Sequence, residues 1–240
     1  MSQPFHIYPL GEKAITIEIG YPISEENHHK VLSLRQFLDQ LPIPGFIETV
    51  PAYCSLTFYY NPIEVVKKFP ESQKGIFSWM NTYLQNELSI WQPGINSTDQ
   101  KLIISIPVCY DEDYGIDLNE IAKYHNSSAE EIIRIHSSVI YTVFLMGFSP
   151  GFPYLGILPN TIATPRKNRP RTKVAPGSVA IAGNQTGIYS LESPGGWNII
   201  GRTPLKLFNK NNENPFLLST GDKVKFIPIS KKAFIELIRE

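Results

Sequence analysis

The stretch SPGGWNIIGRTP, residues 193–204, places an indole ring, a guanidinium and a hydroxyl within seven residues, at Trp197, Arg202 and Thr203. Glycine and proline supply much of the rest, which is typical of loops and short strands. In one interpretation Trp197 walls a ligand pocket, while Arg202 and Thr203 bind an anion. In the other, Trp197 anchors the end of a barrel and Arg202 pairs with an acid such as Glu192.

Aromatic rings also gather in GFSPGFPYLG, residues 147–156, where Phe148, Phe152 and Tyr154 alternate with glycine and proline. A loop of this composition cannot shelter every ring in the core of a helix or strand. The rings either plug one end of a barrel or form the aromatic wall of a cleft, since they offer flat apolar contact at low entropic cost.

Cations are dense in TPRKNRPRTKV, residues 164–174. Five fall within eight residues: Arg166, Lys167, Arg169, Arg171 and Lys173. Most such runs are solvated loops, but the two prolines stiffen this one and arginine suits bidentate capture of carboxylate or phosphate. An anion site is therefore a fair hypothesis. Nucleic acid is a weaker one, because no aromatic residues are interleaved with these charges.

Gln185 and Thr186 lie between Gly183 and Gly187 in AGNQTGIY, residues 182–189. Small residues let a ligand approach the backbone, whose N–H groups then become donors. The pattern matches neither a phosphate loop nor a dinucleotide-binding fingerprint, so it identifies no nucleotide site.

Histidine supplies no clear catalytic group. His28 and His29 are predicted on the polar side of a helix, and no metal-ligand spacing is present, so a metal site is not expected. His136, just ahead of the aromatic loop, is either a proton carrier or an ordinary packing residue. The catalytic residue is therefore unknown, with His136 and Arg202 as candidates.

Bulk composition indicates a folded protein without a strong charge preference. Of 240 residues 42% are hydrophobic, and 22 basic residues balance 22 acidic ones, which gives no overall attraction to nucleic acid or an anionic membrane. The N-terminus lacks signal-peptide features and no apolar run is long enough to span a bilayer, so we expect a cytoplasmic protein. Cys54 and Cys109 are expected to be buried thiols there rather than a disulfide.

Hydrophobic periodicity predicts an α+β protein of two domains, residues 1–92 and 93–240. The first reads β-β-α-β-β-α, with a helix starting at Ser24, which suggests helices on one face of an antiparallel sheet. The polar segment at residues 91–100 marks the boundary. The second opens with a strand and a helical lead-in capped by Ser127 or Ser128. Short apolar runs at residues 143–229 then indicate a barrel or sandwich.

The motifs GFSPGFPYLG, GSVAIAGNQTGIY and SPGGWNIIGRTP strongly resemble the family of the 5-oxoprolinase B subunit, which includes the Kip inhibitor of a sporulation histidine kinase and the domain called allophanate hydrolase subunit 1. The resemblance covers nearly the whole chain. It implies a small α+β N-terminal domain and a cyclophilin-like β-barrel C-terminal domain. The barrel would carry a groove, and the residues that match its lining are Phe148, Phe152, Tyr154, Arg169, Gln185, Thr186, Trp197, Arg202 and Thr203.

The resemblance also implies a hydrolase that works as a hetero-oligomer. With 5-oxoprolinase subunits C and A, such a chain uses ATP to open 5-oxoproline to glutamate, and a site shared between chains would explain why no complete catalytic set is visible. The alternative is a regulatory inhibitor that binds a sensor histidine kinase. We expect Trp197 and Arg202 to contact solvent in the lone chain and to face a cavity shared with a partner, so that Trp197→Ala would weaken association with the C subunit.

Overall fold

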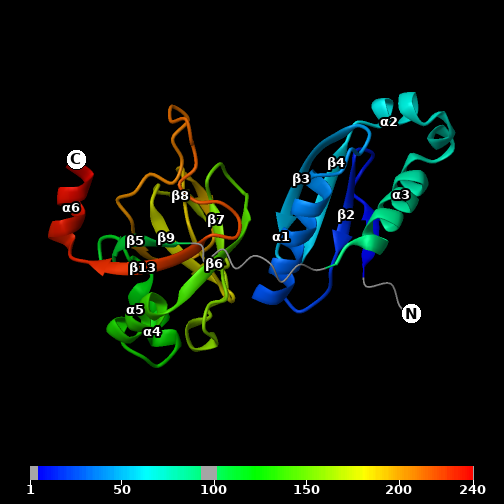
Figure 1. Ribbon diagram of the computed structural model, residues 1–240. Coiled ribbons are helices and arrows are strands. Elements are labelled where there is room, and N and C mark those ends of the chain that lie inside the picture. The colour runs from blue at the N-terminus through cyan, green and yellow to red at the C-terminus, as the bar shows by residue number, and fades with distance from the viewer. Residues whose placement is uncertain (1–4, 93–101, 240) are drawn as a thin grey trace. The chain divides into compact units, whose positions relative to one another are not determined.

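The computed structural model describes residues 5–92 and 102–239 and divides into two compact units, Met1–Gln100 and Lys101–Glu240 (Figure 1). The predicted boundary segment largely coincides with residues 93–101, which lie outside the described residues. The α+β class and the barrel expected for the second unit are both confirmed.

The N-terminal unit contains a four-stranded antiparallel sheet in the order β1-β2-β4-β3. One helix separates β2 from β3 in the sequence, and the other helical segments follow β4. Its elements are β1 (His6–Pro9), β2 (Ala14–Glu18), α1 (Glu25–Asp39), β3 (Phe46–Ala52), β4 (Ser55–Tyr60), α2 (Pro62–Lys68), a 3-10 helix (Pro70–Lys74) and α3 (Ile76–Ile90). This order matches the predicted β-β-α-β-β-α.

Alternate side chains of β2 lie on opposite faces of the sheet, and the helices pack against the face that carries the isoleucines. Ile15 and Ile17 are fully buried in one core with apolar residues of α1 and α3, whereas Thr16 on the other face bonds Thr57 of β4 at 3.1 Å. Helix α1 starts as expected, since the Ser24 hydroxyl accepts from the third residue beyond it. His28 departs from the prediction: it is buried, with Nδ1 3.2 Å from a backbone carbonyl, because the turn at Tyr53 covers it.

The C-terminal unit is a closed barrel of strand order β10-β7-β6-β13-β5-β12-β9. Its strands are β5 (Ile103–Cys109), β6 (Ile140–Met146), β7 (Pro153–Gly156), β9 (Ser178–Ala182), β10 (Gln185–Ile188), β12 (Asn198–Arg202) and β13 (Lys223–Ile229). A separate ribbon pairs β8 (Arg171–Val174) with β11 (Ser193–Gly195), and the helical segments are α4 (Leu118–Tyr124), α5 (Ala129–Ser138), a 3-10 turn (Asn160–Ile162) and α6 (Lys231–Arg239).

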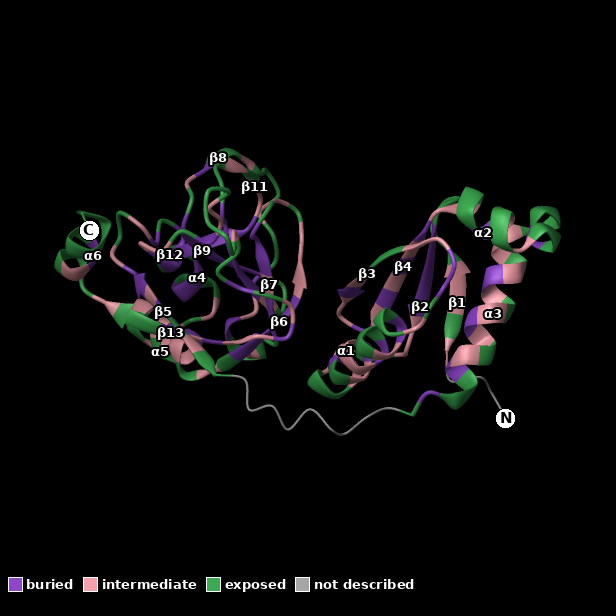
Figure 2. Cartoon of the chain, turned by 45° about the horizontal axis from the view of Figure 1, so that its top comes forward, coloured by how far each residue is buried: buried purple, intermediate pink, exposed green. Residues whose placement is uncertain are grey.

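Alternate side chains of strand β9 belong to two different hydrophobic clusters. Val179 and Ile181 point into the barrel core, whereas Ala180 and Ala182 belong to a second cluster, shared with Val174 of the ribbon. Purple buried residues therefore lie both within the barrel and under the β8–β11 ribbon (Figure 2). The predicted cap of α5 is confirmed at Ser128, whose hydroxyl accepts from the Glu131 N–H.

Candidate functional site

Trp197 lies in the core, contrary to the expectation that it faces solvent. It is 5% exposed, and Phe152, 2% exposed, meets it edge-on with ring centroids 5.6 Å apart. Together with Tyr189 these rings fill the space between the outer wall of the barrel and the β8–β11 ribbon. Trp197 and Phe152 are therefore packing residues rather than the wall of a cleft. The β8–β11 ribbon covers them, and the local sequence gives no sign of that cover. Tyr154 is only partly buried at the edge of the same cluster.

Gly195, two residues before Trp197, also has a packing role. A Cβ at Gly195 would collide with the Tyr189 hydroxyl and ring, so β11 can cross this ring only as glycine. Above the indole, the Arg166 guanidinium lies 5.8 Å from the ring centroid, a cation–π contact that covers its outer side.

Phe148 is the ring of the aromatic loop that does reach solvent. Its side chain is 62% exposed, and its φ of 64° is in the left-handed region that bulky residues rarely adopt. The loop is held in this conformation by Ser190, whose hydroxyl donates to the Pro150 carbonyl at 2.6 Å and lies 3.2 Å from the Ser149 hydroxyl. A bulky residue that is held in this unfavourable conformation, and whose ring is largely exposed, is typical of a functional contact.

His136 is sealed inside the barrel at 0% exposure, within a chain of buried polar groups. Its Nδ1 lies 2.8 Å from the Tyr110 hydroxyl and its Nε2 2.9 Å from Thr186 Oγ1, which itself donates to the Ala180 carbonyl at 3.1 Å. Thr186 Oγ1 must then accept, so the ring proton is on Nε2 and Nδ1 accepts from Tyr110.

Burial lowers the pKa of His136 to about 3 and raises the pKa of Tyr110 well above its usual value. Both groups are therefore neutral at physiological pH, and both are buried. His136 acts as a packing residue rather than a proton carrier. Thr186, expected in the groove, is its partner in the core and is 0% exposed.

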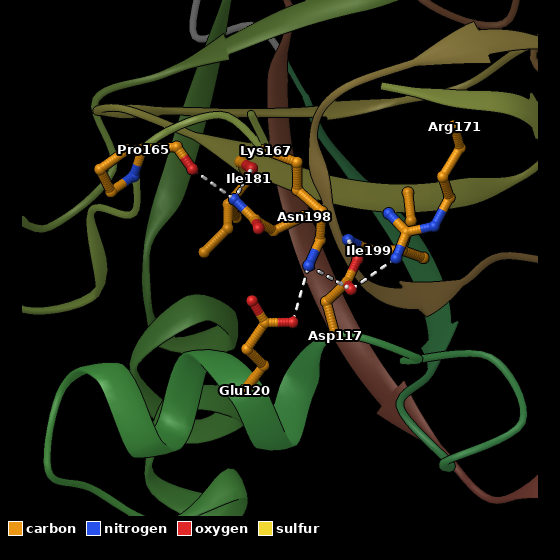
Figure 3. Close-up of polar contacts among 8 residues, drawn as sticks. All are labelled: Asp117, Glu120, Pro165, Lys167, Arg171, Ile181, Asn198 and Ile199. Carbon is orange, nitrogen blue, oxygen red and sulfur yellow. Dashed lines mark hydrogen bonds and ion pairs between the residues drawn. The ribbon is translucent and has the colours of Figure 1, made fainter. Parts of the chain in front are cut away.

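Asp117 binds two of the five cations of residues 166–173, Lys167 and Arg171, and was not anticipated from the sequence. The carboxylate is 3% exposed; its Oδ1 lies 2.6 Å from Arg171 Nη2 and 2.9 Å from Lys167 Nζ, while Oδ2 accepts from the Ile199 N–H at 2.7 Å (Figure 3). Lys167 also pairs with Glu120 at 2.7 Å. Asp117 precedes α4 where a helix cap would stand, yet it makes no side-chain cap and instead ties β12 to the basic loop.

Arg202 borders a pocket of about 210 Å³ on the outer side of the barrel. Its Nε donates to the Pro176 carbonyl at 2.9 Å, which fixes the base of the guanidinium. The turn beneath it requires Gly177, since φ is +82° and a Cβ would lie 2.5 Å from the Thr203 carbonyl. The pocket is lined by Asp113, Tyr114, Ile116, Arg171, Lys173, Val174, Ala175, Ser178, Ile199 and Arg202.

The remaining groove candidates lie elsewhere. Thr203 is 3% exposed and its hydroxyl accepts from the Leu205 N–H at 3.3 Å, so it closes a turn instead of facing a ligand. Arg169 is exposed and Gln185 half-buried, and neither lines the Arg202 pocket. Of the predicted pairing alternatives, Glu192 takes Lys173 at 2.8 Å rather than Arg202.

Comparison with known proteins identifies the family. The carboxyltransferase domain family, subdomain C and D, matches residues 5–218. The 5-oxoprolinase B subunit of Bacillus subtilis (strain 168) is 41% identical over 98% of this chain and 97% of its own. The chain belongs to the 5-oxoprolinase B-subunit family. A further member, from Escherichia coli O157:H7, is 36% identical over 92% of this chain and 94% of its own.

A solved structure shows the same fold within a longer polypeptide. TTHA0988 superimposes with a TM-score of 0.74 at 33% identity, over 91% of this chain but only 40% of TTHA0988. This member of the B-subunit family thus spans less than half of that related chain. Within the described ranges, residues 5–92 and 102–239, no helix has the length and apolar character needed to cross a membrane.

Proposed function

We propose that this chain is the B subunit of an ATP-dependent 5-oxoprolinase, which opens 5-oxoproline to glutamate together with the A and C subunits. The observation that carries the proposal is the 41% identity to a named 5-oxoprolinase B subunit, which extends over almost the full length of both chains. Chance or a single shared domain cannot account for a match of this extent.

The site chemistry supports a subunit rather than a self-sufficient enzyme. The candidate proton carrier His136 is neutral and sealed, and the pocket at Arg202 offers charge and shape but, among its described lining residues, no free general base. The one carboxylate in that lining, Asp113, is held by Lys231. Groups that move protons are therefore expected from a partner chain, while this chain binds and orients.

ATP does not fit the Arg202 pocket. Sites for drug-sized ligands span about 300–1,000 Å³, and 210 Å³ is below that range, so a nucleoside triphosphate would not be enclosed. We place ATP binding on another subunit and derive no step through it on this chain.

Phe148 is the side chain that we assign to partner contact. An exposed ring on a restrained loop offers a large apolar contact at little entropic cost, and aromatic residues are enriched at interfaces. TTHA0988, in which the matching region is joined to further polypeptide, is consistent with a fold that works beside other domains. This replaces Trp197, whose burial removes it from any such surface.

Reconstitution tests the proposal. The purified chain is combined with the A and C subunits, ATP and 5-oxoproline, and glutamate is measured; the Bacillus subtilis B subunit in the same mixture is the positive control. We expect glutamate only when all three subunits and ATP are present. No glutamate from this chain, while the control is active, would refute the assignment.

Phe148→Ala, compared with the exposed-residue control Leu191→Ala, should weaken binding to the C subunit by about tenfold or more in a titration. Equal affinities of the two variants would remove Phe148 from the interface. The inhibitor of a sensor histidine kinase remains the alternative prediction, and autophosphorylation of such a kinase with added chain would test it.

A further inference from the structure

We propose that the Arg202 pocket binds the carboxylate of a small organic acid, and that within the proposed function this is the carboxylate of the lactam substrate. The second part rests on the 5-oxoprolinase assignment. The first part rests on the pocket alone, through its charge, its polar atoms and its size.

Charge within the pocket concentrates on Arg202. Lys173 is paired with Glu192, Arg171 with Asp117, and Asp113 with Lys231. In the described residues, Arg202 has no carboxylate partner, and its side chain makes one hydrogen bond there, from Nε to Pro176. Both terminal nitrogens, Nη1 and Nη2, therefore remain available for the two oxygens of a carboxylate, the pairing that the planar guanidinium favours.

Arg171 lines the same pocket, and one of its terminal nitrogens is an unsatisfied donor. Its Nη2 is bound to Asp117, whereas its Nη1 is inaccessible to water and has no hydrogen-bond partner within residues 5–92 and 102–239. An enclosed donor without an acceptor costs free energy comparable to a lost hydrogen bond. An anion beside Arg202 would lie close to the charge of Arg171, and a turn of the Arg171 side chain toward the pocket would give Nη1 that acceptor.

The two guanidinium groups are positioned before any ligand arrives. Asp117 holds Arg171 and is itself fixed to the Ile199 backbone, while Pro176 holds Arg202 through Nε. Donors restrained in this way lose little conformational entropy when a ligand binds, which favours affinity for even a small anion.

The rest of the pocket suits a compact apolar ring attached to the acid. Its apolar lining comes from Tyr114, Ile116, Val174, Ala175 and Ile199, and Val174 and Ile199 also belong to the Trp197 cluster below. A volume of about 210 Å³ accommodates a small metabolite. A five-membered lactam bearing one carboxylate matches both the apolar wall and the cationic side, whereas a neutral lactam would leave the Arg202 guanidinium without an anionic partner.

Binding to the full chain tests the site directly. Protein NMR signals are followed during titration with 5-oxoproline, with 2-pyrrolidinone, which is the same ring without the carboxylate, and with inorganic phosphate. We expect saturable shifts of pocket residues with 5-oxoproline, affinity at least about tenfold lower for 2-pyrrolidinone, and no tighter binding of phosphate. Tighter binding of phosphate, or equal binding of the neutral lactam, would overturn the proposal.

Variants assign the effect to Arg202. Arg202→Gln should weaken 5-oxoproline binding about tenfold or more, and Arg202→Lys should restore part of it. The control Lys206→Gln removes an exposed cation that does not line the pocket and should stay within about twofold of wild type, since an exposed charge is screened by salt. Unchanged binding in Arg202→Gln, with a native melting curve, would overturn the proposal.

The assembled enzyme separates the two proposals. If glutamate forms normally but Arg202→Gln leaves KM and kcat for 5-oxoproline unchanged, the carboxylate site is wrong and the function stands. If no glutamate forms although the chain binds 5-oxoproline through Arg202, the function is wrong and the anion site stands.

Discussion

Lowering the pH from 7 to 5 should destabilise the C-terminal unit by about 2 kcal/mol through His136 alone. Burial lowers the pKa of this histidine from 6.5 to about 3 in the folded chain. The unfolded chain, with a pKa near 6.5, binds a proton in this window while the folded chain does not. Stability is therefore highest above the unfolded pKa and falls as the pH drops, by about 1.4 kcal/mol per unit once well below 6.5.

Structure explains why the folded chain resists the proton. The Nδ1 atom that would be protonated already accepts from the Tyr110 hydroxyl, and His136 has no exposed surface. A charged imidazole here would face a donor and lose its hydration, both of which disfavour the charged form. A loss of about 2 kcal/mol is a large part of the stability of a typical domain.

The fluorescence of Trp197 can be used to follow unfolding of the C-terminal unit. This residue is the only tryptophan after residue 100, so replacement of Trp79 and Trp91 by Phe leaves a fluorescence signal specific to the C-terminal unit of the full chain. Urea unfolding is followed at pH 7, 6 and 5 in this background, with and without His136→Gln. Glutamine does not titrate, yet its amide can accept from Tyr110 and donate to Thr186.

The comparison isolates one residue, because all other titrating groups are shared. We expect the free energy of unfolding to fall between pH 7 and 5 by about 2 kcal/mol more in the protein that retains His136 than in the His136→Gln variant. Identical pH dependence in the two proteins would show that His136 is solvated or charged in the folded state, and the packing interpretation would be refuted.

Three further predictions concern the packing and the ion pairs. Trp197→Ala should cost about 3–5 kcal/mol in thermal unfolding followed by circular dichroism, because it empties part of a closed aromatic cluster; a loss below about 1 kcal/mol would contradict its burial. Asp117→Asn should cost about 3 kcal/mol in urea unfolding, since it leaves Lys167 and Arg171 without their shared carboxylate, and an unchanged midpoint would contradict the network. Burial raises the pKa of both thiols, so Cys54 and Cys109 should react with a disulfide reagent slowly at about pH 8 until urea is added, and immediate reaction in native buffer would contradict this.

Local patterns were sufficient for much of the architecture. The alternation of Ile15 and Ile17 with Thr16 identified a strand, and Ser24 and Ser128 marked helix starts, because caps and periodicity act between residues close in the chain. The half-buried character that the alternation predicts was wrong, since Ala14 and Thr16 are buried as well. The barrel texture was visible in the same way, as short apolar runs separated by turn formers. The buried state of Cys54 and Cys109 also followed from their apolar surroundings.

Side-chain exposure in the candidate site did not follow from local pattern. Phe148 and Phe152 occur in one glycine- and proline-rich loop, yet one is in solvent and the other in the core, because the β8–β11 ribbon covers only part of the barrel wall. Asp117 had no visible role, since its partner Arg171 is 54 residues away in sequence.

Family membership, the order of elements in the first domain and the residue types available for chemistry followed from the sequence alone, because they depend on residue identity and on spacing along the chain. The three-dimensional fold was needed to establish that Trp197, Thr186 and His136 are buried in the core while Arg202 borders a pocket. The reason is physical: burial and pairing are set by segments distant in sequence that fold against each side chain, and they decide whether a ring, a hydroxyl or a charge can meet a ligand.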